Sequence, residues 1–289
     1  MKKYFLIPLL IILLVFCSCA PAKESQVVAT TKPIYEFTSY LCQDTEILVD
    51  LLVTEDISCL HDYSLQVWQM RALESAQMVI LNGAGLESFM EDLPTLKAHY
   101  IDCSTGVSLI CPEDNHHHDE DHHHDADPHF WLDIASAKIM VENICDGLTA
   151  EYPQHKEKFT KNKKALIEEL NALYEYGKAA LKNIKNREMI TFHDGFAYFA
   201  ECFDLTILAA VEEESGAEAS AAELIDLIKI VNAHSLPAVF TEASGSTSAA
   251  QIIAAETGAC IYSLDMCMSE SSYFDAMYHN INTVKEALK

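Results

Sequence analysis

"PQHKEKFTKNKKALIEELNALYEYGKAALKNIK" (residues 153–185) has the periodicity of one long helix. Its apolar residues recur at spacings that keep them on a single helix face. These residues are Phe159, Leu166, Leu170, Leu173, Leu181 and Ile184. At 1.5 Å per residue, a helix of roughly 30 residues spans about 45 Å, which is long enough to join two domains.

Short apolar runs on both sides of this helix alternate with segments of helical spacing, such as 65–76. The runs before it are 27–31, 46–53, 78–83 and 99–104, and those after it are 189–193, 205–211, 238–242 and 260–265. Ser220 and Glu223 form a capping-box pair at the start of a further helix. This alternation is typical of parallel sheets covered by helices. We therefore predict an α/β fold of two lobes, each with a mainly parallel β-sheet flanked by helices, joined by one long helix.

The N-terminus has the features of an export signal. Two lysines precede an apolar run, Tyr4–Phe16, that is too short for an ordinary membrane-spanning helix. Ser18 before Cys19 resembles a bacterial lipoprotein cleavage box, which makes Cys19 the expected lipidated N-terminus; plain secretion with cleavage near Ala20 is the alternative. The predicted segments are a signal peptide (1–18), a tether (19–26), an N-terminal lobe (27–150), a linking helix (151–186) and a C-terminal lobe (187–289). We expect an extracytoplasmic protein held at the cell membrane by lipid.

Charge and cysteine content narrow the function. The net charge of −25 argues against nucleic-acid binding and is compatible with attracting cations. None of the ten cysteines forms a C-x-x-C pair, which argues against a zinc ribbon. Export permits disulfides, with Cys202 and Cys260 as one candidate pair, but packed free thiols fit equally well.

Four residues are candidate metal ligands: His61, His129, His193 and Asp265. His61 follows a predicted strand, and His193 and Asp265 lie where strands end. Each alone is ordinarily a structural polar residue, but open α/β sheets bind ligands beyond the carboxyl ends of their strands. Two ligands from each half would hold one ion between the lobes, and imidazoles with a carboxylate suit zinc.

A histidine-rich segment, 115–126, precedes His129. Its histidines are His116, His117, His118, His122, His123 and His124, and they alternate with acidic residues. No apolar residue separates them, so we predict a mobile loop. The loop is either a solvated spacer or an auxiliary site that binds metal more weakly than the site in the cleft between the lobes.

Five segments resemble one family. They are "ILNGAGLESFMEDL" (80–93), "DPHFWLDIASAKIMVENICDGL" (127–148), "FHDGFAYFAECFDL" (192–205), "FTEASGSTSAAQIIAAETG" (240–258) and "YSLDMCMSESSYFDAMYHNINTVKEAL" (262–288). They are similar to the zinc and manganese solute-binding lipoproteins of bacterial ABC importers, called cluster A-I or the zinc-uptake and adhesin-like lipoprotein family. The resemblance implies a rigid linking helix and the ligands His61, His129, His193 and Asp265. It also implies delivery of the metal to a membrane permease driven by an ATPase, and we expect a monomer.

Zinc is the expected cargo, with Mn²⁺ or Fe²⁺ as alternatives. Intrinsic affinity favours zinc over both, and in this family histidine-rich loops accompany zinc. Because zinc binds neutral imidazole, we expect affinity to fall below about pH 6. The family often has prolines a few residues after the first ligand, which "DYSLQVWQM" (62–70) lacks.

A metal-dependent hydrolase is the rival class, because His61 and His193 are each followed by aspartate. The chain has no HExxH helix and no G-x-S-x-G elbow. Four protein ligands would also fill a tetrahedral site and exclude the water that catalysis needs, so we expect no enzymatic activity. Glu242 has a weaker claim as a cleft residue, and a structural role is expected for it. The sequence has no positive signal for adhesion.

Overall fold

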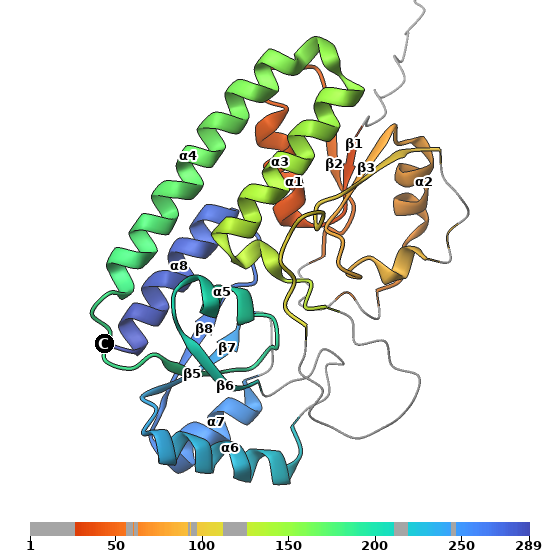
Figure 1. Ribbon diagram of the computed structural model, residues 1–289. Coiled ribbons are helices and arrows are strands. Elements are labelled where there is room, and N and C mark those ends of the chain that lie inside the picture. The colour runs from red at the N-terminus through yellow and green to blue at the C-terminus, as the bar shows by residue number, and fades with distance from the viewer. Residues whose placement is uncertain are drawn as a thin grey trace, which may run out of the picture.

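The computed structural model describes residues 27–55, 60, 63–91, 93, 97–111, 126–210, 219–243 and 247–289. The expected signal peptide and Cys19 lie outside these residues. Two four-stranded parallel sheets form the two lobes, with a layer of long helices beside them (Figure 1). In the described part of the chain, no helix is long and apolar enough to cross a membrane.

The first lobe has the strand order β2-β1-β3-β4, and every neighbouring pair is parallel. Its strands are β1 (Val27–Ala29), β2 (Val49–Leu51), β3 (Met78–Leu81) and β4 (His99–Asp102), and its helices include α1 (Lys32–Leu41) and α2 (Val67–Ser75). The central strands β1 and β3 are almost entirely apolar and buried, as expected of parallel strands covered on both faces. All four strands lie inside the predicted apolar runs.

The second lobe repeats this arrangement with the order β6-β5-β7-β8. Its strands are β5 (Glu188–Thr191), β6 (Thr206–Ala210), β7 (Ala238–Glu242) and β8 (Cys260–Leu264), and its helices are α5 (Ala197–Cys202), α6 (Ala221–His234) and α7 (Ser248–Thr257). The predicted capping box at Ser220 and Glu223 is present at the start of α6.

The candidate disulfide is wrong, because Cys202 and Cys260 are both free thiols. Cys202 ends α5, which packs against the edge strand β6, whereas Cys260 begins β8 at the opposite edge of the sheet. The other described cysteines are also free, and most are buried, so these thiols serve as small apolar packing groups.

The predicted long helix is α4 (Lys156–Leu181), which at 26 residues spans about 39 Å between the lobes. It is preceded by a 3-10 turn, η3 (Pro153–His155), and further short turns are η1 (Ser88–Met90) and η2 (Phe130–Leu132). The guanidinium of Arg187 donates to the Leu181 carbonyl at 3.0 Å and so pairs one of the carbonyls that have no partner within the last turn of α4. The helix therefore ends earlier than its apolar pattern predicts.

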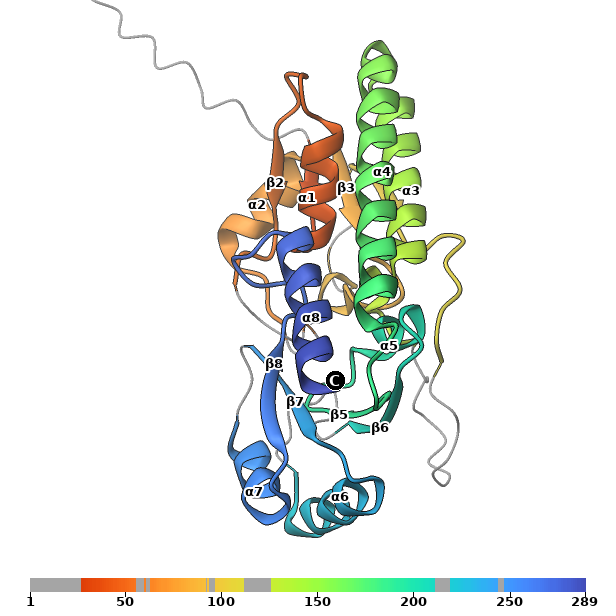
Figure 2. The ribbon, with the colours of Figure 1, turned by 90° about the vertical axis from the view of Figure 1, so that its left-hand side faces the viewer.

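Two further helices lie beside α4. They are α3 (Ile134–Glu151) and α8 (Tyr273–Ala287), and Figures 1 and 2 show α3 along the upper part of α4 and α8 along its lower part. One buried apolar core runs without interruption from the first lobe through these helices into the second. Within it, the rings of Phe37 and Tyr273 meet edge to face with centroids 4.8 Å apart. The two lobes are thus packed against each other and are not independent bodies on a flexible joint.

Candidate metal centre

His129 lies between the lobes at the start of η2, with only 3% of its surface exposed. Its Nδ1 donates to Oδ1 of Asp127 at 2.7 Å, and the same carboxylate oxygen accepts from the His129 backbone N–H at 2.9 Å. This pair of bonds fixes the ring orientation and leaves Nε2 as the nitrogen that can bind a ligand, which is how carboxylates commonly support metal-binding histidines.

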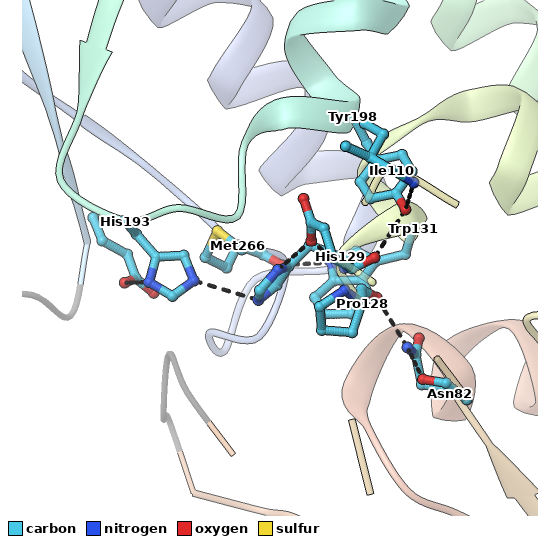
Figure 3. A network of polar contacts seen from close by, with 11 residues as sticks. Asn82, Ile110, Pro128, His129, Trp131, His193, Tyr198 and Met266 are labelled. Carbon is cyan, nitrogen blue, oxygen red and sulfur yellow. Dashed lines mark hydrogen bonds and ion pairs between the residues drawn. The ribbon is translucent and has the colours of Figure 1, made fainter. Parts of the chain in front are cut away.

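His193 reaches the same point from the second lobe. It lies two residues after β5, is 5% exposed, and places its Nε2 3.3 Å from Nε2 of His129 (Figure 3). The two rings are nearly perpendicular, at 89°. On the other side of the His193 ring, Nδ1 lies 3.8 Å from Oε2 of Glu242, at the end of β7.

The distance between the two Nε2 atoms suits a shared metal ion. Two nitrogens that each bind zinc at about 2.0–2.1 Å with a tetrahedral angle lie about 3.3–3.4 Å apart. The observed 3.3 Å matches this spacing. One histidine comes from each lobe.

Asp265 lies directly after β8 and is 7% exposed. Its Oδ1 accepts from the backbone N–H of Cys267 at 2.8 Å, and its Oδ2 accepts from the Ser269 hydroxyl at 2.6 Å. Asn280 of α8 pairs with both backbone polar groups of Asp265. The carboxylate is therefore held in place, and each oxygen keeps a lone pair for a further partner.

The other predicted ligands fall outside the described residues. These are His61 and the auxiliary histidines His116, His117, His118, His122, His123 and His124. Among the residues that the structure describes, no three histidine, cysteine or acidic side chains are close enough together to form a metal site. The structure thus brings His129 and His193 together and does not add Asp265 to them as a third close group.

Trp131 connects the segments that carry His129 and Asp265. Its indole N–H donates to the Met266 carbonyl at 2.8 Å, and its own carbonyl accepts from the Tyr273 hydroxyl at 2.8 Å. Its ring also meets the His129 ring with centroids 5.2 Å apart. A shift of the segment that carries Asp265 would therefore move Trp131 and, with it, the His129 ring.

A buried carboxylate supports the Asp127–His129 segment from the first lobe. Glu87 accepts from the backbone N–H groups of Asn82 and Gly83 at 2.7 and 3.0 Å and from the Thr30 hydroxyl at 2.6 Å. Burial raises the pKa of Glu87. The loop so fixed directs the amide of Asn82 to the Pro128 carbonyl at 3.0 Å.

Sequence reasoning assigned no role to Asp127, Trp131, Asn82 or Glu87. A local signal exists for Asp127, because a carboxylate two residues before a candidate histidine ligand can fold back onto it. Trp131 carries no comparable signal, since its partner Met266 is 135 residues away in the chain.

Comparison with known proteins gives a consistent result. Residues 27–287 match the family model described as zinc-uptake complex component A, periplasmic. The zinc-binding lipoprotein AdcA of Streptococcus pneumoniae serotype 4 is 30% identical over 271 residues, which cover 89% of this chain and 54% of that protein. The high-affinity zinc uptake system protein ZnuA of Bacillus subtilis is 28% identical, with 91% of this chain and 87% of that protein covered. The chain thus spans about half the length of AdcA and most of ZnuA.

Solved structures share the fold. A crystal structure of ZnuA superposes with a TM-score of 0.81 at 26% identity, covering 92% of this chain and all of that one. The laminin-binding adhesin of Streptococcus agalactiae gives a TM-score of 0.79 at 23% identity, which shows a common fold only. With a family model matched across both lobes and the linking helix, the chain belongs to the zinc-uptake complex component A family.

Proposed function

We propose that the protein is the extracytoplasmic solute-binding component of an ABC importer, which captures Zn²⁺ between its lobes and delivers it to a membrane permease. The observation that carries the proposal is the 3.3 Å separation of the His129 and His193 Nε2 atoms, one from each lobe, which matches the edge of a tetrahedral zinc site. The zinc-binding and zinc-uptake names of the relatives AdcA and ZnuA support it.

The proposed ligands are His61, His129, His193 and Asp265. The Nε2 atoms of His129 and His193 already lie 3.3 Å apart. Asp265 lies on the segment that Trp131 binds, and its hydrogen bonds leave lone pairs on the carboxylate for a metal. Four protein ligands would complete a tetrahedron and leave no open position for a reacting water. The centre therefore serves carriage, and the protein is not an enzyme.

Zinc is preferred over Mn²⁺ and Fe²⁺ because a site with three imidazoles binds zinc more tightly than either ion. The six histidines between His116 and His124 act as an auxiliary, weaker metal collector. Cys19 carries the lipid anchor, the protein works as a monomer, and its partners are the permease and its ATPase.

Calorimetry with competition between Zn²⁺ and Mn²⁺ tests the proposal. We expect one tight zinc site that is lost in His129→Ala and in His193→Ala. The matched control is His234→Ala, which removes a half-exposed histidine paired with Glu188 on the surface of the second lobe. Zinc binding that survives both cleft substitutions would contradict the ligand set, and tighter binding of Mn²⁺ would contradict the cargo.

Two further measurements separate the remaining parts of the proposal. Deletion of residues 115–126 should remove weak zinc sites and leave the tight one; loss of the tight site would make that segment the primary ligand. Hydrolysis of phosphate esters by the zinc-loaded protein, abolished in His193→Ala, would overturn carriage in favour of catalysis.

A further inference from the structure

The hydroxyl of Tyr198 makes two hydrogen bonds beside the candidate metal centre. Tyr198 belongs to α5 of the second lobe and is 3% exposed. Its hydroxyl donates to the Asp127 carbonyl at 2.8 Å and accepts from the Ile110 backbone N–H at 2.8 Å (Figure 3). Burial raises the pKa of Tyr198 to about 12, so the hydroxyl keeps the proton that it donates.

Asp127 is the point at which these contacts converge. Its backbone carbonyl accepts from Tyr198, its backbone N–H donates to the Ile110 carbonyl at 2.8 Å, and its carboxylate holds Nδ1 of His129. The backbone carbonyl, the backbone N–H and the carboxylate of Asp127 are thus all hydrogen-bonded. A displacement of the Asp127 backbone would be passed directly to the His129 ring.

Tyr198 and His193 lie on one short segment of the second lobe, five residues apart, and Asp127 and His129 lie on one short segment between the lobes. The two segments meet at two points. At one point the Tyr198 hydroxyl bonds Asp127, and at the other the two Nε2 atoms lie 3.3 Å apart. Two contacts between the same pair of segments determine how far apart they lie. With a single contact, one segment could pivot about the other.

We propose that Tyr198 is a positioning residue that sets the spacing of the His129 and His193 nitrogens and thereby the preference of the centre for zinc. The inference rests on the function proposed above. Zinc depends strongly on imidazole nitrogens, whereas Mn²⁺ takes its binding energy mainly from oxygen ligands. Loosening the nitrogen pair therefore costs zinc more than it costs Mn²⁺.

Tyr198→Phe removes the hydroxyl and keeps the ring, which packs near Phe130. Loss of a group that supports a metal ligand typically weakens metal affinity 10–100-fold. We expect zinc affinity to fall by about that factor, Mn²⁺ affinity to fall less, and the ratio of the two dissociation constants to shift towards Mn²⁺ by about tenfold. The absorption spectrum of the Co²⁺-loaded protein should change as well, because its d–d bands report the geometry of the ligands.

Tyr152→Phe is the matched control. Tyr152 is also buried, and its hydroxyl bonds Gln77 at 3.2 Å, at the amino end of the first sheet and away from the metal centre. Tyr198→Phe loses two hydrogen bonds of a tyrosine hydroxyl and Tyr152→Phe loses one, so thermal melting of both variants shows how much of any change is general destabilisation. We expect Tyr152→Phe to bind zinc, Mn²⁺ and Co²⁺ as the wild type does.

The outcomes separate the inference from the proposed function. Failure of the wild-type protein to bind zinc would overturn the function. If the wild type binds zinc, two results would show that Tyr198 has only a structural role and that the inference is wrong. One is a Tyr198→Phe variant that keeps its zinc affinity. The other is a variant that loses zinc and Mn²⁺ affinity equally and keeps the Co²⁺ spectrum of the wild type.

Discussion

Gly195 lies against the ring of His193, and the substitution Gly195→Ala tests the role of that histidine with a single methyl group. A Cβ atom at position 195 would lie 2.6 Å from Cδ2 and 2.9 Å from Nε2 of His193, and 2.6 Å from Cε of Met266. Contacts under 3.0 Å are essentially never seen for real Cβ atoms. The ring, the methionine or the backbone must therefore move.

The size of the displacement follows from these distances. Ordinary van der Waals contact begins at 3.4 Å, so the crowded atoms must separate by roughly 0.5–0.8 Å. Binding constellations need their groups held within about 0.5 Å of the productive geometry. We expect zinc affinity to fall about 10–100-fold, which corresponds to about 1.4–2.8 kcal/mol.

Gly147→Ala supplies the control for crowding alone. It lies in α3, where the added Cβ would meet Cδ1 of Ile101 at 2.6 Å, as close as the nearest contact at Gly195. Overpacking costs typically about 1–3 kcal/mol of stability at either position. Zinc titration by calorimetry and thermal melting in the presence of a chelator should show two destabilised proteins, of which only Gly195→Ala binds zinc weakly.

If Gly195→Ala binds zinc with the wild-type dissociation constant while its melting temperature falls, the added methyl group has been accommodated without weakening the metal centre. The prediction that crowding at position 195 displaces a zinc ligand would then be wrong. Equal loss of zinc affinity in Gly147→Ala would show that general destabilisation, and not the position of the ring, controls binding.

Three further predictions concern the surroundings of the site. Asp127→Ala should weaken zinc binding about 10–100-fold because the His129 Nδ1 proton loses its acceptor; unchanged calorimetric affinity would contradict this. In Trp68→Phe, Trp131 is the one remaining tryptophan, and its emission should change during zinc titration because its ring lies 5.2 Å from that of His129; a silent titration would place the metal elsewhere. Burial raises the pKa of Glu87 above its ordinary value of 4.5, so the folded protein keeps this proton to a higher pH than the unfolded chain does. The free energy of unfolding should therefore fall as the pH rises from 4.5 to the raised pKa of the folded state. Glu87→Gln should remove this contribution, and parallel stability curves for variant and wild type from pH 4 to 8 would refute it.

Sequence alone predicted the elements whose pattern is local. The run 238–242 is entirely strand because its buried, mostly apolar residues form the centre of a parallel sheet, and His193 lies just past a strand as predicted. The start of the long helix differs by one turn, because the residues from Pro153 to His155 form a 3-10 turn. The candidate disulfide was wrong because the sequence positions of cysteines do not show that Cys202 ends a helix beside β6 while Cys260 begins β8 at the opposite edge of the sheet.

The contacts that support the centre were beyond prediction for a physical reason. Tyr198 and Asp127 are 71 residues apart, and Trp131 and Met266 are 135 apart, so each bond exists only once both lobes and the linking helices are packed. No periodicity or short motif records such a pairing. The histidines could be proposed from strand ends, whereas the residues that orient them required the tertiary structure.

The packing of the lobes also limits how a bound metal can be released. A continuous apolar core joins the two lobes, so wide separation would expose buried surface at a cost of about 25 cal/mol for each Å². The Asp265 segment is joined to the rest of the protein by two hydrogen bonds with Asn280 and one from Trp131, each with a net contribution of about 1 kcal/mol. Its residues Met266–Met268 belong to the same core, but they are a small part of it, so a small shift of this segment costs less than opening the lobes. We expect release to begin there, with His129 and His193 still in place until the carboxylate has left the metal.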